Sequence, residues 1–256
     1  MTAPACAPAV LGLADDALIY AQRLGEWISR APQIEEDMAL GNIGLDLLGR
    51  ARALYTWLGS VDGTGRSEDD FAYWRDEREF RHVHLVEQPR GDFADEMIRL
   101  LLVASLDVER YAALASCGDA GSSCGELAGI AAKAVVESRY HREHAALWVV
   151  RLGDGTEESA ARMTAAVSRV APYIPELFDD SPADVAAVAA GCGVLPSSLE
   201  GSVLGGVSAV LSEAGLALPE ASWRSRGGRN GLHSEACGYL LAEMQHLARS
   251  HPGATW

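Results

Sequence analysis

The stretch ELAGIAAKAVVESRYHREHAALWVVRL, residues 126–152, is the strongest indicator of the fold, because its apolar positions follow the period of an α-helix from end to end. One stripe of residues recurs at intervals of three and four: Leu127, Ala131, Ala134, Ser138, His141, Ala145, Trp148 and Leu152. A stripe of this width is the face that a helix buries against its neighbours. We therefore predict one long helix whose buried face carries the imidazole of His141, one turn after the carboxylate of Glu137.

Three stretches upstream show the same helical period. Four long helices are predicted in all, over about residues 15–31, 32–58, 92–117 and 126–152. Asp15 and Asp16 suit a helix N-terminus because of the helix dipole, so the first dozen residues, rich in Ala and Pro, are expected to form a loose tail. Asp92 is expected to cap the third helix. Four long amphipathic helices, joined by short loops or one longer crossover, predict an all-α fold of the ferritin-like four-helix-bundle type.

Shorter helices are predicted after the bundle, where prolines and glycines interrupt the helical period. These periodic segments cover about residues 157–170, 203–214 and 234–249. Ser234 is a candidate cap of the last of them. We expect a single ferritin-like domain over residues 1–256, with the bundle at about 13–152 and a C-terminal helical extension at about 157–250.

The composition excludes several classes of partner. The chain carries 36 acidic against 21 basic residues, a formal net charge of −15, which repels nucleic acid and anionic membrane surfaces. No apolar run is long enough to span a bilayer, and the N-terminus has no secretory signal segment. The five cysteines are odd in number and scattered, so no disulfide framework is expected. These features predict a cytoplasmic protein with neither a nucleic-acid nor a membrane partner.

The ligand pattern of a di-iron centre is broken in this sequence. A ferritin-like centre takes one Glu from each of two helices and a Glu-x-x-His pair from each of the other two. Three residues after Glu137 stands Tyr140, and three residues after Asp46 stands Gly49. Lone carboxylates remain available at Glu26, Glu96 and Glu109. We therefore predict that this chain has no catalytic residues and no catalytic metal site, and that His141 is a hydrogen-bonded core histidine.

Two literal Glu-x-x-His strings occur elsewhere, Glu79–His82 and Glu243–His246. Neither lies on a predicted bundle helix, and they are far apart in the predicted architecture, so we do not expect them to share a metal ion. His233 is expected at a loop or cap position.

Two clusters of arginines stand out on this acidic chain: Arg75, Arg78 and Arg81, and Arg224, Arg226 and Arg229. Most clusters of this kind are solvated ion-pair faces. A minority bind phosphates, and CoA thioesters carry several, which the guanidinium fork would suit.

Several strings along the chain closely resemble one protein family. They are QRLGEW at 22–27, LGNIGLDLLG at 40–49, RDER at 75–78, LVEQP at 85–89, RYH at 139–141, RLG at 151–153, GLH at 231–233 and LAEMQ at 241–245. The resemblance extends from about residue 15 to the end of the chain. It is to the structural C subunits of the ring-1,2-phenylacetyl-CoA epoxidases, or phenylacetate-CoA oxygenases, which are bacterial multicomponent oxygenases.

The resemblance implies a ferritin-like structural subunit that has lost its metal ligands and binds no cofactor of its own. Its partners would be a catalytic di-iron subunit of the same fold, other epoxidase subunits and a reductase. Such an assembly epoxidises the aromatic ring of phenylacetyl-CoA with O2, in aerobic phenylacetate catabolism. The family also implies that the CoA thioester approaches this subunit at the interface, at the segment matched here by Glu79, Phe80, Arg81 and His82. Arg81 and His82 depart from the small polar residues usual after the phenylalanine.

Three hypotheses about function follow. The first is the non-catalytic partner subunit, with an apolar face on the first two helices buried against the catalytic chain. The second is a self-sufficient di-iron oxidase with an irregular site formed by Glu137, His141, Glu26 and Asp46. The third is a ferritin-like interaction or storage protein without an oxygenase partner.

Overall fold

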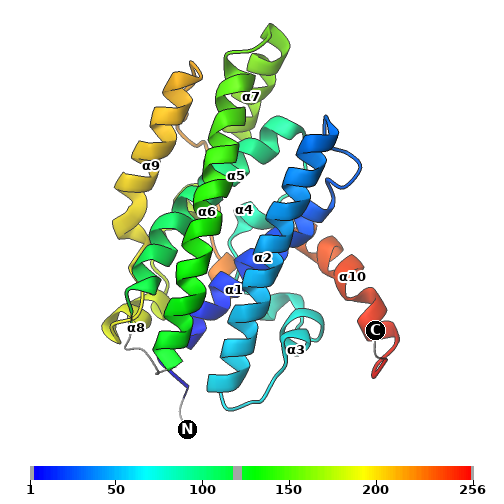
Figure 1. The fold of residues 1–256 in the computed structure, drawn as a ribbon, viewed down its shortest axis with the longest axis vertical. Coiled ribbons are helices and arrows are strands. Elements are labelled where there is room, and N and C mark those ends of the chain that lie inside the picture. Colours follow the sequence, from blue (N-terminus) through cyan, green and yellow to red (C-terminus); the bar gives the residue numbers. More distant parts are fainter. Residues whose placement is uncertain (1–2, 118–122, 255–256) are drawn as a thin grey trace. The chain divides into compact units, whose positions relative to one another are not determined.

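The computed structural model describes residues 3–117 and 123–254, and every regular element in these ranges is helical (Figure 1). The α-helices are α1 Ala7–Gly25, α2 Ile34–Val61, α3 Glu68–Tyr73, α4 His84–Glu87, α5 Phe93–Ala115, α6 Ser123–Gly153, α7 Glu157–Val170, α8 Pro182–Ala189, α9 Pro196–Glu213 and α10 Glu235–Ser250. Short 3-10 segments are η1 Glu77–Glu79, η2 Ala171–Tyr173, η3 Pro175–Phe178 and η4 Gly228–Asn230. The predicted all-α class is confirmed.

The chain divides into two compact units. Unit 1 contains the residues up to Pro89 and those from Arg226 onward, and unit 2 contains Arg90–Ser225. The last part of the predicted C-terminal extension therefore belongs to the same unit as α1 and α2. The single domain over residues 1–256 stays a prediction.

Unit 1 is organised around the antiparallel pair α1 and α2, with α10 packed against α3, α4 and η1. Its core includes Leu24, Ile43, Leu54 and Trp57, which are fully buried. α1 begins at Ala7, so the prediction of a loose tail over the first dozen residues was wrong. Cys6, Ala7 and Val10 are buried, and this burial stabilises the helix ahead of its predicted start at Asp15.

Unit 2 is organised around the pair α5 and α6, with α7 and α9 packed against both. Asp92 caps α5 as predicted: it accepts a hydrogen bond from the Asp95 backbone N–H at 3.1 Å, and the Asp95 carboxylate accepts one from the Asp92 N–H at 2.9 Å. α9 begins at Pro196, earlier than predicted, because a proline in the first helical turn starts a helix at no cost in hydrogen bonds.

The stripe that predicted α6 is buried along most of its length. Its members from Leu127 to Ala145 are at most about 2% exposed, and at the end of the helix Val149 is buried in place of Trp148. The Trp148 ring instead lies edge-on to Phe93, with centroids 5.1 Å apart. Among the described helices, none is both long and apolar enough to cross a membrane.

Candidate functional site: the polar core of unit 1

Unit 1 contains a set of buried or half-buried ionisable side chains, here called the polar core: Asp15, Asp16, Arg75, His82, Glu87, Arg229 and His233. They come from α1, from the segment between α3 and α4, from α4, and from η4 and the loop after it. The polar core therefore ties three parts of the chain together that are far apart in sequence.

Asp15 is the centre of one half of the polar core. It is fully buried, and its carboxylate accepts hydrogen bonds from the Tyr55 hydroxyl, from Arg75 Nη1 at 3.0 Å and from the Arg81 backbone N–H at 2.7 Å. Burial opposes the charge on Arg75, but the Asp15 carboxylate outweighs it and raises the pKa of that guanidinium. Burial, followed by Asp15, raises the pKa of Tyr55 well above its usual value, so the hydroxyl stays protonated and donates.

Asp16 pairs with Arg229, which brings the C-terminal segment back onto α1. Arg229 Nη2 lies 2.6 Å from the Asp16 carboxylate, and Nη1 donates to the carbonyls of Arg81 at 2.7 Å and Gly12 at 2.9 Å. A Cβ on Gly12 would lie 2.8 Å from Arg229 Nη1 and 3.3 Å from the Arg81 carbonyl. The missing side chain of Gly12 therefore gives the guanidinium room to approach the helix backbone.

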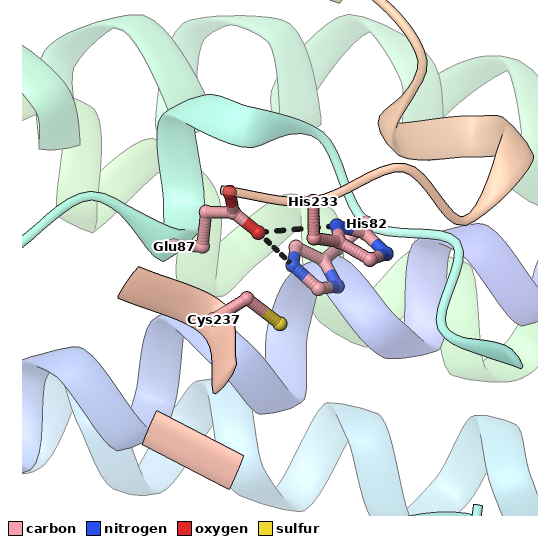
Figure 2. Close-up of side chains that lie close together, drawn as sticks. All are labelled: His82, Glu87, His233 and Cys237. Atoms are coloured by element: carbon pink, nitrogen blue, oxygen red, sulfur yellow. Dashed lines mark hydrogen bonds and ion pairs between the residues drawn. The ribbon is translucent and has the colours of Figure 1, made fainter. Parts of the chain in front are cut away.

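Glu87 is the centre of the other half (Figure 2). One carboxylate oxygen, Oε2, lies 2.7 Å from His82 Nε2 and 3.1 Å from His233 Nδ1, and the other accepts the Ser234 backbone N–H at 2.7 Å. Burial alone would raise the pKa of Glu87, but the hydrogen bonds from His233, His82 and Ser234 hold it well below its usual value. Burial lowers the pKa of His82, although the hydrogen bond to Glu87 opposes this. The Glu87 carboxylate is therefore ionised, and the His82 imidazole is neutral.

Cys237, on the first turn of α10, completes a converging group of donors. One ligand atom from each of His82, Glu87, His233 and Cys237 lies within 4.8 Å of all the others. Burial, followed by the nearby Glu87, raises the pKa of the Cys237 thiol. Within residues 3–117 and 123–254, this is the group of three or more His, Cys, Asp and Glu side chains that could hold a metal ion.

Of the four predicted substrate-binding residues, His82 belongs to the polar core and the other three directly precede it in the chain. Glu79 is exposed, and its carboxylate accepts the Asp76 backbone N–H at 2.7 Å. Arg81 is half-buried and donates through Nη1 to the carbonyls of Arg78 and Phe80. Phe80 and His82 are fully buried, and the Arg75 guanidinium stacks 4.1 Å from the Phe80 ring centroid. The substrate role of these four residues stays a prediction.

The candidate iron ligands predicted from the sequence lie in both units: Glu26 and Asp46 in unit 1, and Glu96, Glu109, Glu137 and His141 in unit 2. Glu26 is bound by Arg23 on the same helix, and Glu137 lies 3.2 Å from Lys133 one turn earlier. The converging donor group found in the described part of the chain includes none of the six. The lack of a di-iron centre in this chain stays a prediction.

The sequence patterns did not predict that the members of the polar core are buried together. Asp15 is in the middle of α1 and not at its start, so the helix-dipole interpretation was wrong. Ser234 is at the N-cap position of α10, but its side chain makes no capping hydrogen bond there, and its N–H donates to Glu87 instead. Arg75 is buried rather than part of a solvated face. Glu87 and His233 lie in the strings LVEQP and GLH, which resemble the family. This resemblance is the sequence signal that could have pointed to these two residues.

The two helical pairs and their associated helices define an all-α protein of the ferritin-like class. Residues 2–256 match the family described as phenylacetic acid catabolic protein, and the chain belongs to this family. The chain is also 41% identical over 246 residues to a protein of Escherichia coli (strain K12) that is named as the C subunit of 1,2-phenylacetyl-CoA epoxidase. The match covers 96% of this chain and 97% of the relative. The predicted ferritin-like fold and the resemblance to the C subunits of the epoxidases are confirmed.

Proposed function

We propose that this chain is the non-catalytic structural subunit of a multicomponent di-iron monooxygenase that epoxidises the aromatic ring of phenylacetyl-CoA in phenylacetate catabolism. The observation that carries the proposal is the 41% identity, over nearly the whole of both chains, to a protein named as the C subunit of 1,2-phenylacetyl-CoA epoxidase. The chain supports a catalytic subunit, which holds the two irons, and works with further epoxidase subunits and a reductase.

The residues at the expected iron positions support a non-catalytic role. Tyr140 and Gly49 stand where the two Glu-x-x-His pairs would have their imidazoles. Tyr140 is more than half exposed, and the Glu137 carboxylate already pairs with Lys133 on the same helix. Without these imidazoles, two irons would lack the nitrogen ligands that a ferritin-like centre uses.

An apolar groove on the α1–α2 pair supports a protein partner. The groove has a volume of about 390 Å³, and its lining includes Leu18, Ile28, Met38, Leu45 and Leu48. Ile28, Met38 and Leu45 are each more than 60% exposed. Contiguous exposed apolar surface is a feature of interaction sites on soluble proteins. We infer that this groove is covered by the catalytic partner.

The segment Glu79–His82 is the proposed contribution to the CoA-thioester site. The Arg81 and Arg78 side chains lie at least partly at the surface of the segment, where guanidinium groups suit phosphate oxygens. Phe80 and His82 are buried, and their burial holds the segment in place.

The test is affinity purification of the tagged chain from its native cell, followed by metal analysis of each chain. We expect a second ferritin-like chain to co-purify and to carry the iron. Recovery of this chain only as a monomer or homo-oligomer would contradict the partner, and about two irons in this chain itself would contradict its non-catalytic role.

A matched pair of variants tests the groove. Leu45→Asp places a charge in it and should weaken capture of the partner at least tenfold, whereas Val185→Asp, at an exposed position on α8, should leave capture unchanged. Equal capture by the two variants would exclude the groove as the interface.

A further inference from the structure

We propose that His82, Glu87, His233 and Cys237 form a binding site for a divalent cation of the Zn2+ type, which joins α4 and the segment before it to the start of α10. This site is separate from the iron of the proposed function, and it does not depend on that proposal.

The donor set points to Zn2+ among common divalent cations. It offers two imidazole nitrogens, one carboxylate oxygen and one thiol sulfur, all within 4.8 Å of one another. Figure 2 shows the Glu87 carboxylate facing both imidazoles, with the Cys237 sulfur beside them. Sulfur and imidazole ligands favour Zn2+ over Mg2+ or Ca2+, which prefer oxygen. Four protein ligands leave no open position, as in structural zinc sites.

The distances require small movements for the ion to enter. Ligand atoms around a tetrahedral Zn2+ lie about 3.3–3.7 Å apart, because Zn–N and Zn–O distances are about 2.0–2.1 Å and Zn–S about 2.3 Å. Here Glu87 Oε2 lies 2.7 Å from His82 Nε2 and 3.1 Å from His233 Nδ1, and the widest pair of ligand atoms is within 4.8 Å. Each atom would therefore move by less than about 1 Å.

One imidazole would also turn. The rings of His82 and His233 stack with centroids 4.0 Å apart and planes 13° apart. Because a nitrogen lone pair lies in the plane of its ring, one ring must tilt before both nitrogens point at a single ion.

The hydrogen bonds around His233 and Glu87 favour a cation. His233 Nδ1 faces the Glu87 carboxylate and Nε2 faces the Phe80 carbonyl at 3.1 Å, so both ring nitrogens face acceptors. A neutral imidazole donates from only one nitrogen. With a cation at Nδ1, the proton on Nε2 satisfies the Phe80 carbonyl, which is the arrangement that orients metal-bound histidines. The Ser234 N–H holds the other Glu87 oxygen in the same way.

Binding has a defined proton balance. The cation replaces the thiol proton of Cys237, which is released to solvent, and each imidazole keeps one proton on the nitrogen that faces away from the ion. For His82 this nitrogen is Nδ1, a buried atom to which the described residues offer no hydrogen-bond partner. In the alternative, Cys237 keeps its thiol proton and no cation binds. The same four side chains then form only a hydrogen-bonded network around Glu87.

The experiment uses the full-length chain after treatment with a chelator and dialysis. Co2+ is the probe, because a bound thiolate gives it a sulfur-to-metal charge-transfer band and Zn2+ should displace it. We expect the band in the wild type and its loss in Cys237→Ser, while Cys192→Ser, at another buried cysteine outside the group, keeps it. His233→Gln should weaken Co2+ binding at least tenfold, and His246→Gln, at an exposed position on α10, should not.

A measurement on the wild type alone covers the case in which these variants fail to fold. Zn2+ should raise the urea midpoint of the metal-free chain and Mg2+ should not, because an ion that binds only the folded state stabilises it. An unchanged midpoint with Zn2+, or a Co2+ band that survives Cys237→Ser, would overturn the proposal. Neither result bears on partner capture or on iron content, so failure of this site and failure of the proposed function remain distinguishable.

Discussion

The polar core of unit 1 and the helix α6 of unit 2 pair their ionisable side chains in different ways. In the polar core, Asp15 pairs with Arg75, 60 residues away, and Glu87 bonds to His233, 146 residues away. On α6 the Glu137 carboxylate pairs with Lys133, four residues earlier on the same helix. The long-range pairs connect separate segments, whereas the local pair adds little to a helix that apolar packing already holds.

The contrast shows why a helical spacing is a weak indicator of a site. Glu137 and His141 share a helix face, but a metal or hydrogen-bonded site needs donors from other segments as well. The converging donors of unit 1 come from a loop, a four-residue helix and the two residues flanking the start of α10.

Asp15→Ala should have the largest effect. It leaves the Arg75 guanidinium buried without its counter-charge, so the free energy of unfolding should fall by about 3–5 kcal/mol, measured by urea denaturation. Glu158→Ala is the control, because it breaks an exposed pair with Arg162 and should cause no measurable change. Equal losses in the two variants would mean that the buried pair is no more important than a surface one.

Glu87→Gln should destabilise the protein by about 2–3 kcal/mol, because His82, His233 and the Ser234 N–H lose a charged acceptor. The same denaturation measurement checks it in metal-free protein. A midpoint equal to that of the wild type would show that the buried carboxylate does not hold these segments together.

Mild acid should destabilise the protein through His82. The pKa of His82 in the folded state is below its ordinary value of 6.5. Below pH 6.5 the unfolded state therefore binds more protons than the folded state, and the free energy of unfolding decreases as the pH is lowered. The lowered pKa of Glu87 acts in the same direction, so the free energy of unfolding continues to decrease below pH 4.5. In the metal-free protein we expect the urea midpoint to fall as the pH is lowered from about 7 to about 5, and to fall less steeply in His82→Gln. An equal slope in this variant would remove His82 as the cause.

Glu137→Gln should have the smallest effect, about 0.5 kcal/mol or less, because its partner Lys133 is largely exposed. Urea denaturation beside Glu87→Gln gives the direct comparison of the two glutamates. A loss as large as that of Glu87→Gln would place Glu137 in a buried network and would remove the contrast between the two regions.

Much of the fold was predictable from local patterns. The helical stripe of α6, the N-cap at Asp92 and the helix over residues 157–170 depend on contacts within a few residues, and the structure has all three. The start of α1 was missed because a short Ala- and Pro-rich segment is helical here only through burial against the rest of unit 1. The buried pairing of Asp15 was not predicted for the same reason. An aspartate near a chain end is interpreted as a helix cap until its buried partner is known.

The helical class, the family and the broken Glu-x-x-His pairs could be read from the chain in order, because they depend on periodicity, short spacings and sequence identity. Which ionisable side chains meet depended on the folded arrangement. It brought His82 and Glu87 to His233 and Cys237, and Asp15 to Arg75, although no period relates these positions. The physical reason is that a buried charge is tolerable only beside its partner, and which partner is available depends on how distant segments pack.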